Sequence, residues 1–306
     1  PGPERAPGAP PLELGTLGAP RALPVSRLSY SGLEDYRRCG YRFYLERALR
    51  LPDALGVAGA APTDLDSQPP GSADAPDPDE LPALLRGTLV HELLEGLDLR
   101  RPVVPSEREV VALAERHGAS VSDQQVTDLR GMVERFADSG LRRRLARARR
   151  TRAELPFSFT LVPPRAGGRS LLVNGFVDVY AVEDDGTLIV DYKSDRLDPG
   201  ADPGKVAESH YGTQRLVYSL AALREGAPRV EVVHQFLERA DEPASVVWEA
   251  ADAPELERRL LTLAAGVVEG RFEPTTEPHR ELCASCPGQS ALCSWPPERT
   301  LASLTV

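Results

Sequence analysis

Long apolar segments are missing from this chain of 306 residues. No run approaches the roughly 18–20 apolar residues that a membrane-spanning helix needs, so we expect no membrane partner. A hydrophobic signal segment is also lacking, and four cysteines are far too few for a disulfide-stapled secreted domain. These absences predict a cytoplasmic protein. The chain begins with Pro1 and not with methionine, which indicates a piece of something longer.

A positive net charge is lacking as well. The formal charge of −10 argues against a protein that simply coats nucleic acid, because such proteins are usually basic. The net value hides an uneven distribution. Residues 63–80 carry six acidic side chains and no basic one, whereas residues 142–152 carry seven arginines and no acidic side chain. The second segment therefore predicts a basic face on an acidic protein.

The remaining composition indicates one large domain between two less ordered ends. Residues 1–26 are rich in Pro, Gly and Ala without periodicity, which is typical of a linker. We expect the domain to span residues 27–296 and a tail to follow at 297–306. Within the domain, residues 52–82 hold seven prolines and the acidic run, which predict a disordered insertion.

Hydrophobic periodicity predicts an α/β fold. A helix is expected to begin after Ser29, whose side chain can cap it, and to continue past Cys39 to Leu45. Further helices are expected at about 83–97, 106–117, from 122 through the arginine cluster, 208–225 and 254–270. Strands are expected at 153–161, 170–182, 187–192, 230–238 and 245–249, the first three as an antiparallel meander. Together these elements predict a mixed central sheet of about five strands flanked by helices.

The four cysteines are spaced as the ligands of one metal centre. Cys283, Cys286 and Cys293 crowd the end of the chain, and Cys39 stands alone near its start. Four thiolates suit an iron–sulfur cluster or a structural zinc ion equally well, and two disulfides are the plainer alternative. A shared metal centre would join the two ends of the domain.

A carboxylate pair and a lysine lie within the predicted meander. Asp191 and Lys193 alternate along one strand, so their side chains face one side and Tyr192 faces the other. A hairpin turn at residues 184–186 can bring Asp178 beside Asp191. Two close carboxylates repel each other unless a cation lies between them, and oxygen ligands suit Mg²⁺ or Mn²⁺. The alternative is an ordinary surface Asp–Lys pair at the end of a strand.

Four further polar residues are weak signals by themselves. His91 lies on the first turns of a predicted helix, where a histidine usually caps or packs, but an imidazole can also bind a metal ion. Gln214 and Tyr218 are one helical turn apart and therefore share a face, as two residues of a solvated surface also would. Glu154 is a carboxylate at the start of a strand that can reach the same site.

The order of these elements resembles the RecB-like branch of the PD-(D/E)xK nucleases. That order is Gly87-x-x-x-His91, Gly175-x-x-Asp178, Asp191-x-Lys193 and Gln214-x-x-x-Tyr218, with one cysteine before and three after. The cysteines resemble the iron–sulfur clasp of AddB-type and CRISPR-associated exonucleases, and residues 28–43 are similar to the start of nuclease modules fused to UvrD-like helicases. The resemblance covers residues 27–296, and the combined motif set is far more specific than any single motif.

The resemblance implies a restriction-endonuclease-like core and a set of site residues. A Mg²⁺ or Mn²⁺ ion would be held by His91, Asp178, Asp191 and the backbone carbonyl of Tyr192. Water would be positioned or activated by Lys193, and a DNA strand would be oriented by Gln214 and Tyr218. A 4Fe-4S cluster would be bound by Cys39, Cys283, Cys286 and Cys293. Apart from the resemblance, the basic segment predicts contacts with DNA or a partner protein by Arg143, Arg144 and Arg147, and a solvated helix end is the alternative.

The function that the resemblance implies is metal-dependent hydrolysis of DNA, as an exonuclease or an endonuclease, with the exonuclease favoured, in a helicase–nuclease that processes and repairs DNA breaks. Val177 precedes Asp178 where the superfamily is named for a proline, and Asp191 stands where many members have glutamate. No ATP-binding motif is found, so a helicase partner would lie outside this sequence. Two alternatives stay open: a non-catalytic DNA-binding or scaffolding module on the same fold, and a zinc-stabilised binding domain.

Overall fold

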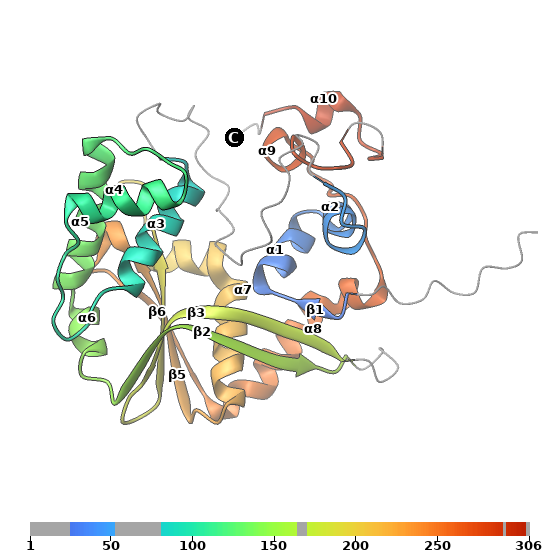
Figure 1. The fold of residues 1–306 in the computed structure, drawn as a ribbon. Coiled ribbons are helices and arrows are strands. Elements are labelled where there is room, and N and C mark those ends of the chain that lie inside the picture. Colours follow the sequence, from blue (N-terminus) through green and yellow to red (C-terminus); the bar gives the residue numbers. More distant parts are fainter. Residues whose placement is uncertain (1–24, 53–80, 164–169, 290–291, 304–306) are drawn as a thin grey trace, which may run out of the picture.

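A computed structural model describes residues 25–52, 81–163, 170–289 and 292–303 (Figure 1). The predicted linker up to residue 24 and the predicted insertion between residues 53 and 80 lie outside the described residues. None of the helices in the described ranges is long and apolar enough to cross a bilayer.

A mixed sheet forms the centre of the domain, as predicted. In the described ranges it has six strands in the order β1-β3-β4-β5-β6, and β2 pairs with β3. The pairs β2–β3, β3–β4 and β5–β6 are antiparallel, and the pairs β1–β3 and β4–β5 are parallel. The strands are β1 Arg27–Leu28, β2 Arg150–Leu161, β3 Leu171–Val182, β4 Thr187–Lys193, β5 Arg229–Phe236 and β6 Ala244–Glu249. The predicted meander is therefore confirmed, and the two-residue β1 is an addition that the sequence did not predict.

Helices cover both faces of the sheet (Figure 1). One face packs against α3 Ala83–Glu95, α4 Glu107–Arg116, α5 Asp123–Asp138 and α6 Gly140–Leu145. The other face packs against α1 Tyr30–Arg38, α7 Pro203–Arg224 and α8 Ala253–Glu269. Short 3-10 turns at Leu237–Arg239 and Ala250–Asp252 follow β5 and β6. Successive residues of a strand point to opposite sides of the sheet. The continuous apolar runs of β4 and β5 therefore supply apolar side chains to both faces.

Capping residues explain where several helices begin and end. Ser29 caps α1 by accepting a hydrogen bond from the Gly32 N–H. Ser106 and Ser122 each form a reciprocal capping box, which satisfies free N–H groups at the starts of α4 and α5. Gly270 ends α8 with φ of 72°, a left-handed conformation that glycine adopts without strain.

Two predicted helices are interrupted, which corrects the sequence interpretation. Cys39 does not lie inside a helix, because its extended backbone (φ −159°, ψ 106°) separates α1 from α2 Gly40–Phe43 and the π-helical turn Tyr44–Ala48. Ser139 (ψ 156°) likewise separates α5 from α6, and its side chain caps α6. The arginine cluster is therefore divided among α6, the following turn and the start of β2. Helical periodicity continues through both breaks, so the sequence pattern did not reveal them.

The two ends of the described chain pack together. Tyr36 on α1 donates from its hydroxyl to the Arg271 carbonyl at 2.7 Å. Near the end of the chain, α9 Arg280–Cys283 contacts α10 Pro297–Thr300, and the Arg280 N–H donates to the Ala302 carbonyl at 2.8 Å. The predicted tail thus includes a short helix that contacts α9, although Thr300 is the buried residue among 297–302.

Candidate active site

The site forms where β3 and β4 separate. Their ladder joins only residues 179–182 to residues 187–190, so Asp178 and Asp191 lie directly beyond its end. On the side where β3 has separated, the N–H and carbonyl of Tyr192 consequently form hydrogen bonds with side chains instead of with a strand. Its N–H donates to Asp178 Oδ2 at 2.7 Å, and its carbonyl accepts from His91 Nε2 at 3.0 Å. The end of the ladder therefore gathers three of the predicted site residues at one point of the backbone.

Asp178 marks a rotation of β3. Val177 packs with the residues of α7 and α8, whereas Val179 packs with those of α3 and α5. On the neighbouring β2, Glu154 lies opposite Asp178 and has φ of 46°. A left-handed backbone is strained for a glutamate, and such strain is concentrated at functional sites. This backbone places the Glu154 carboxylate at the same point as the Asp178 carboxylate.

His91, Glu154 and Asp178 form the group best suited to hold a metal ion. One ligand atom of each lies within 4.8 Å of the others, and His91 Nδ1 is 3.5 Å from Asp178 Oδ2. An imidazole and two carboxylates are donors that Mn²⁺ and Mg²⁺ accept. The sequence analysis expected Glu154, at the start of a strand, to be able to reach this site, and the structure brings its carboxylate into the group.

The charge of Asp178 supports the same role. Burial alone would raise the pKa of this carboxyl group, but His91, the Tyr192 N–H and Lys193 together hold its pKa below the ordinary value. Asp178 is therefore a carboxylate at neutral pH and keeps its charge well into the acidic range.

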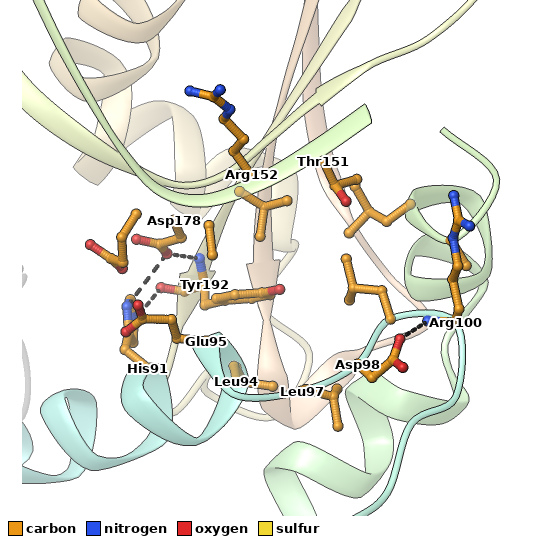
Figure 2. Close-up of a pocket in the computed structure, with 16 residues that line it drawn as sticks. His91, Leu94, Glu95, Leu97, Asp98, Arg100, Thr151, Arg152, Asp178 and Tyr192 are labelled. Carbon is orange, nitrogen blue, oxygen red and sulfur yellow. Dashed lines mark hydrogen bonds and ion pairs between the residues drawn. The ribbon is translucent and has the colours of Figure 1, made fainter. Parts of the chain in front are cut away.

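A cavity of about 270 Å³ begins at this group. Figure 2 shows His91 and Asp178 converging on the backbone of Tyr192, with Arg100 and Asp98 across the cavity from them. Leucines from α3 and α6 form much of its wall, and Arg100 and Arg152 add positive charge. Sequence analysis did not single out Arg100, and it treated Arg152 only as part of the cluster. Their position in the wall of the same cavity became visible only in the fold.

Asp191 and Lys193 lie behind this group, on the α7 side of β4. Lys193 Nζ is 2.8 Å from Asp191 Oδ2, and the two side chains are 1% and 2% exposed. Their shared side of the strand is as predicted, but their burial rules out the alternative of a surface pair. Asp191 is not among the three residues whose ligand atoms converge, because its carboxylate faces α7.

Gln214 and Tyr218 hold the Asp191 carboxylate. Gln214 Nε2 donates to Asp191 Oδ1 at 2.7 Å, and the Tyr218 hydroxyl lies 3.2 Å from the same oxygen. Both side chains are 2% exposed. Both side chains thus contact Asp191 in this structure, and the predicted contact with a DNA strand stays a prediction. The shared helical face was predicted, and the structure directs it to the protein interior.

Tyr211 is a site residue that sequence analysis missed. Its ring centroid lies 4.2 Å from Lys193 Nζ, and its hydroxyl donates to Asp195 Oδ2 at 2.7 Å. Tyr211 has non-helical dihedral angles (φ −118°, ψ 16°) inside α7, and this local bend places the ring beneath the lysine. A ring face stabilises a buried cation by about 2 kcal/mol. A tyrosine within a helix with many apolar residues is expected to pack in the hydrophobic core. The sequence therefore gave no indication of this contact with Lys193.

The predicted DNA-contacting arginines have unequal surroundings. Arg144 donates to Glu183 at 2.8 and 2.6 Å and to Glu231 at 2.9 Å, and these hydrogen bonds raise its pKa. Its guanidinium group therefore joins α6 to the sheet. Arg143 and Arg147 are less enclosed, although Arg143 also donates to the Asp138 carbonyl. Arg143 and Arg147 thus offer more surface to a ligand than Arg144, whose guanidinium group is engaged by two glutamates.

All four cysteines are free thiols that line one small cavity. The disulfide alternative is therefore wrong. Cys39 Sγ accepts from the N–H groups of Arg42 and Thr275, each at 3.4 Å. Burial raises the pKa of Cys283 and Cys286, and the nearby Cys39 thiol adds to the effect. Such a set of cysteines fits either an iron–sulfur cluster or a zinc ion, since cysteines bind each of these centres as thiolates.

Comparison with known proteins identifies the family. A profile of the PD-(D/E)XK nuclease superfamily matches residues 27–293, and the chain belongs to that superfamily. An ATP-dependent helicase/nuclease subunit from Moorella thermoacetica is 33% identical over 130 residues, which are 39% of this chain and 9% of that protein. The protein of the same name from Bacillus anthracis is 26% identical over 151 residues, 44% of this chain and 12% of that protein. A solved structure from Eubacterium rectale aligns with 89% of this chain over 91% of its own length, with 13% identity and a TM-score of 0.48.

The chain thus spans only about a tenth of the length of the curated relatives that it matches.

Proposed function

We propose that this chain is a metal-dependent DNA exonuclease module that acts with a helicase module in the processing of DNA breaks. The observation that carries the proposal is the convergence of His91, Glu154 and Asp178 at one end of a cavity, with the buried Asp191–Lys193 pair behind them on the α7 side of β4. Membership of a nuclease superfamily supports hydrolysis. The relatives are named as ATP-dependent helicase/nuclease subunits, which supports a helicase partner.

The metal ligands that we propose are His91, Asp178 and Asp191, with Glu154 and the Tyr192 carbonyl completing the set. A bound Mg²⁺ or Mn²⁺ ion would supply Lewis-acid polarisation of the scissile phosphate. The low pKa of Asp178 keeps this carboxylate charged and ready to bind a cation at neutral pH. The Tyr192 N–H fixes the position of that carboxylate through a hydrogen bond of 2.7 Å.

Lys193 is the residue that we assign to the attacking water or to the charge developing on the phosphate. Its ammonium group is held between Asp191 Oδ2 and the ring of Tyr211, so its position does not depend on substrate. A fixed cation in a water-poor site stabilises a developing negative charge more than a solvated one does. Arg100 and Arg152 supply positive charge along the cavity, where phosphates of the strand would lie.

We further propose that Cys39, Cys283, Cys286 and Cys293 bind a 4Fe-4S cluster with a structural role. Their arrangement around one cavity supports a single centre, and the likeness to nuclease clasps favours iron–sulfur over zinc. A purified sample decides between the two metals, because an iron–sulfur protein is brown and a zinc protein is colourless.

The test of nuclease activity is incubation with end-labelled single- and double-stranded DNA, with and without Mg²⁺ or Mn²⁺. We expect cleavage that requires the metal ion and is abolished in Asp178→Asn and Asp191→Ala, both of which remain folded. Asp184→Asn is the matched control, because Asp184 lies exposed on the turn between the same two strands. DNA binding without cleavage under every metal condition would instead support the scaffolding function.

A further inference from the structure

His234 is a buried residue outside both the predicted motifs and the mechanism above. It lies on β5 in register with Asp191 on β4, and it is 0% exposed. Its ring stacks on the ring of Tyr211, with centroids 5.1 Å apart and planes inclined by 19°. A fully buried imidazole requires partners for both ring nitrogens.

Those partners fix the tautomer of His234. Arg215 Nε is always a donor, so the bond of 3.2 Å to His234 Nδ1 makes that nitrogen the acceptor. The hydrogen of the neutral ring is then on Nε2, which donates to Gln214 Oε1 at 3.0 Å. Burial, together with the charges of Lys193 and Arg215, holds the pKa of His234 well below its ordinary value, so the ring stays neutral.

The tautomer in turn fixes the side-chain amide of Gln214. With Oε1 occupied by the histidine, Nε2 points to the other side and donates to Asp191 Oδ1 at 2.7 Å. The same nitrogen donates to the Tyr218 hydroxyl at 3.0 Å. A flipped amide would set Oε1 against the carboxylate, where two acceptors repel each other. The hydrogen bonds therefore run in one direction, from Arg215 through His234 and Gln214 to Asp191.

We propose that His234 and Arg215 are positioning residues of the nuclease site, which act through Gln214 to hold Asp191 Oδ1. Oδ2 of the same carboxylate then remains directed to Lys193, at 2.8 Å, so the orientation of this proposed metal ligand is fixed. This inference rests on the proposed function. Loss of an outer partner of a metal ligand typically weakens metal affinity about 10- to 100-fold, so the effect is measurable without DNA.

The test compares three variants of the whole chain. His234→Phe keeps a ring to stack on Tyr211 but removes both nitrogens. His234→Gln restores a donor toward Gln214. Val233→Ala is the matched control, because this neighbouring residue of β5 packs on the opposite face with the residues of α3 and α5, so its truncation disturbs only the core.

The first readout is Mn²⁺ affinity without DNA, measured from the electron paramagnetic resonance signal of the free ion. We expect His234→Phe to weaken Mn²⁺ binding about 10-fold and His234→Gln to recover most of that loss. On labelled DNA, His234→Phe is expected to lower kcat while KM stays within about twofold. Val233→Ala is expected to lower the melting temperature while Mn²⁺ affinity keeps its parent value.

Nitrogen-15 NMR tests the tautomer itself, and a hydrogen found on His234 Nδ1 would overturn the inference. So would a folded His234→Phe variant with the Mn²⁺ affinity and kcat of the parent. If His234→Phe does not fold, Arg215→Met replaces it, since this variant keeps the imidazole but releases its tautomer, and unchanged Mn²⁺ affinity there has the same meaning. A parent protein that neither binds Mn²⁺ nor cleaves DNA overturns the proposed function, whereas an active parent with unaffected variants overturns the positioning role alone.

Discussion

A buried lysine and a buried aspartate form an ion pair on β4. At the scale of single residues, this pair governs how substitutions at the site change the free energy of unfolding. Neither Lys193 nor Asp191 is more than 2% exposed. Removing the water around two charges costs several kcal/mol per ion, so such a pair adds little net stability. Loss of one partner is much more harmful, because the other charge is then left buried.

Lys193→Met is therefore expected to lower the free energy of unfolding by about 3 kcal/mol, since it leaves the Asp191 carboxylate without its cation. Urea denaturation measures the change. Lys205→Met is the control, because Lys205 is the other lysine of the chain and is exposed near the start of α7, and we expect a change within about 0.5 kcal/mol. The double variant Asp191→Asn/Lys193→Met should recover most of the loss, and a double variant as unstable as Lys193→Met would contradict this account.

Local spacing determined part of this arrangement. The alternation of a strand predicted that Asp191 and Lys193 share a side, and their ion pair confirms it. The surroundings of the pair could not be predicted, because they come from α7 and β5, whose packing against β4 is a tertiary property. Gln214 was therefore assigned to DNA rather than to Asp191, and the sequence analysis did not single out His234.

At the scale of elements, β2 contains the local strain that brings Glu154 to the site. The positive φ of Glu154 stands opposite the rotation of β3 at Asp178. Strand prediction from sequence assumes extended backbone throughout, so a single left-handed residue inside a strand leaves no signal in the pattern.

Substitution of Glu154 separates backbone strain from carboxylate chemistry. Glu154→Gly and Glu154→Ala both remove the carboxylate, and we expect both to reduce DNA cleavage. Glycine adopts φ of 46° without strain and alanine does not, so Glu154→Gly should be more stable than Glu154→Ala by about 1 kcal/mol. Chemical denaturation of the pair measures the difference. Equal stabilities would show that the backbone relaxes to an extended conformation once the glutamate is removed.

The helices illustrate a different limit of sequence reasoning. The expected ranges of α3, α4, α7 and α8 agree with the structure to within about five residues, and α4 and α8 carry a clear apolar stripe on one side. The breaks at Cys39 and Ser139 were not predicted, because the helical spacing of apolar residues continues through each of them. The second break turned one predicted basic helix into short pieces with separate partners.

Arg144 and Arg143 on α6 should consequently behave differently. Arg144→Gln removes the hydrogen bonds to Glu183 and Glu231, and we expect it to lower the free energy of unfolding by about 2 kcal/mol. Arg143→Gln is expected to change stability by less than about 0.5 kcal/mol but to weaken DNA binding and flatten its dependence on salt. Thermal melts and salt titrations of binding test the two together. Equal losses of stability would argue against the assignment of Arg144 to the sheet.

At the scale of the whole molecule, the proposed cysteine clasp would join α1 and α2 to the segment around α9. Cys39 lies between α1 and α2, and the other three cysteines lie on α9 and the segment after it. The sequence predicted this junction from count and spacing alone, and the shared cavity agrees with it. It could not distinguish a cluster from zinc, because four thiolates suit both.

Cys286→Ser is expected to lower the melting temperature and to remove the visible absorption of the cluster. The physical reason is linkage, since a centre that binds only the folded chain stabilises it. Ser294→Ala, beside Cys293 but without a thiol, is the control and should keep both properties. Absorption spectra, iron content and thermal melts provide the measurement. A Cys286→Ser variant with full iron content and an unchanged melting temperature would show that Cys286 does not stabilise the fold through a bound cluster.

The contact between the two ends of the domain also dictates an order of events during synthesis. The hydroxyls of Tyr36 on α1 and Tyr41 on α2 donate to the carbonyls of Arg271 and Leu292, which leave the ribosome late. The hairpins of the sheet join neighbours in sequence and can form while translation continues, whereas contacts between distant residues form slowly. These two contacts must therefore wait for the later residues, although α1 can already pack on α7 and β3. A chain held on a ribosome that paused before residue 271 should be cleaved by protease around Tyr36 and Tyr41 more readily than one that extends past residue 292.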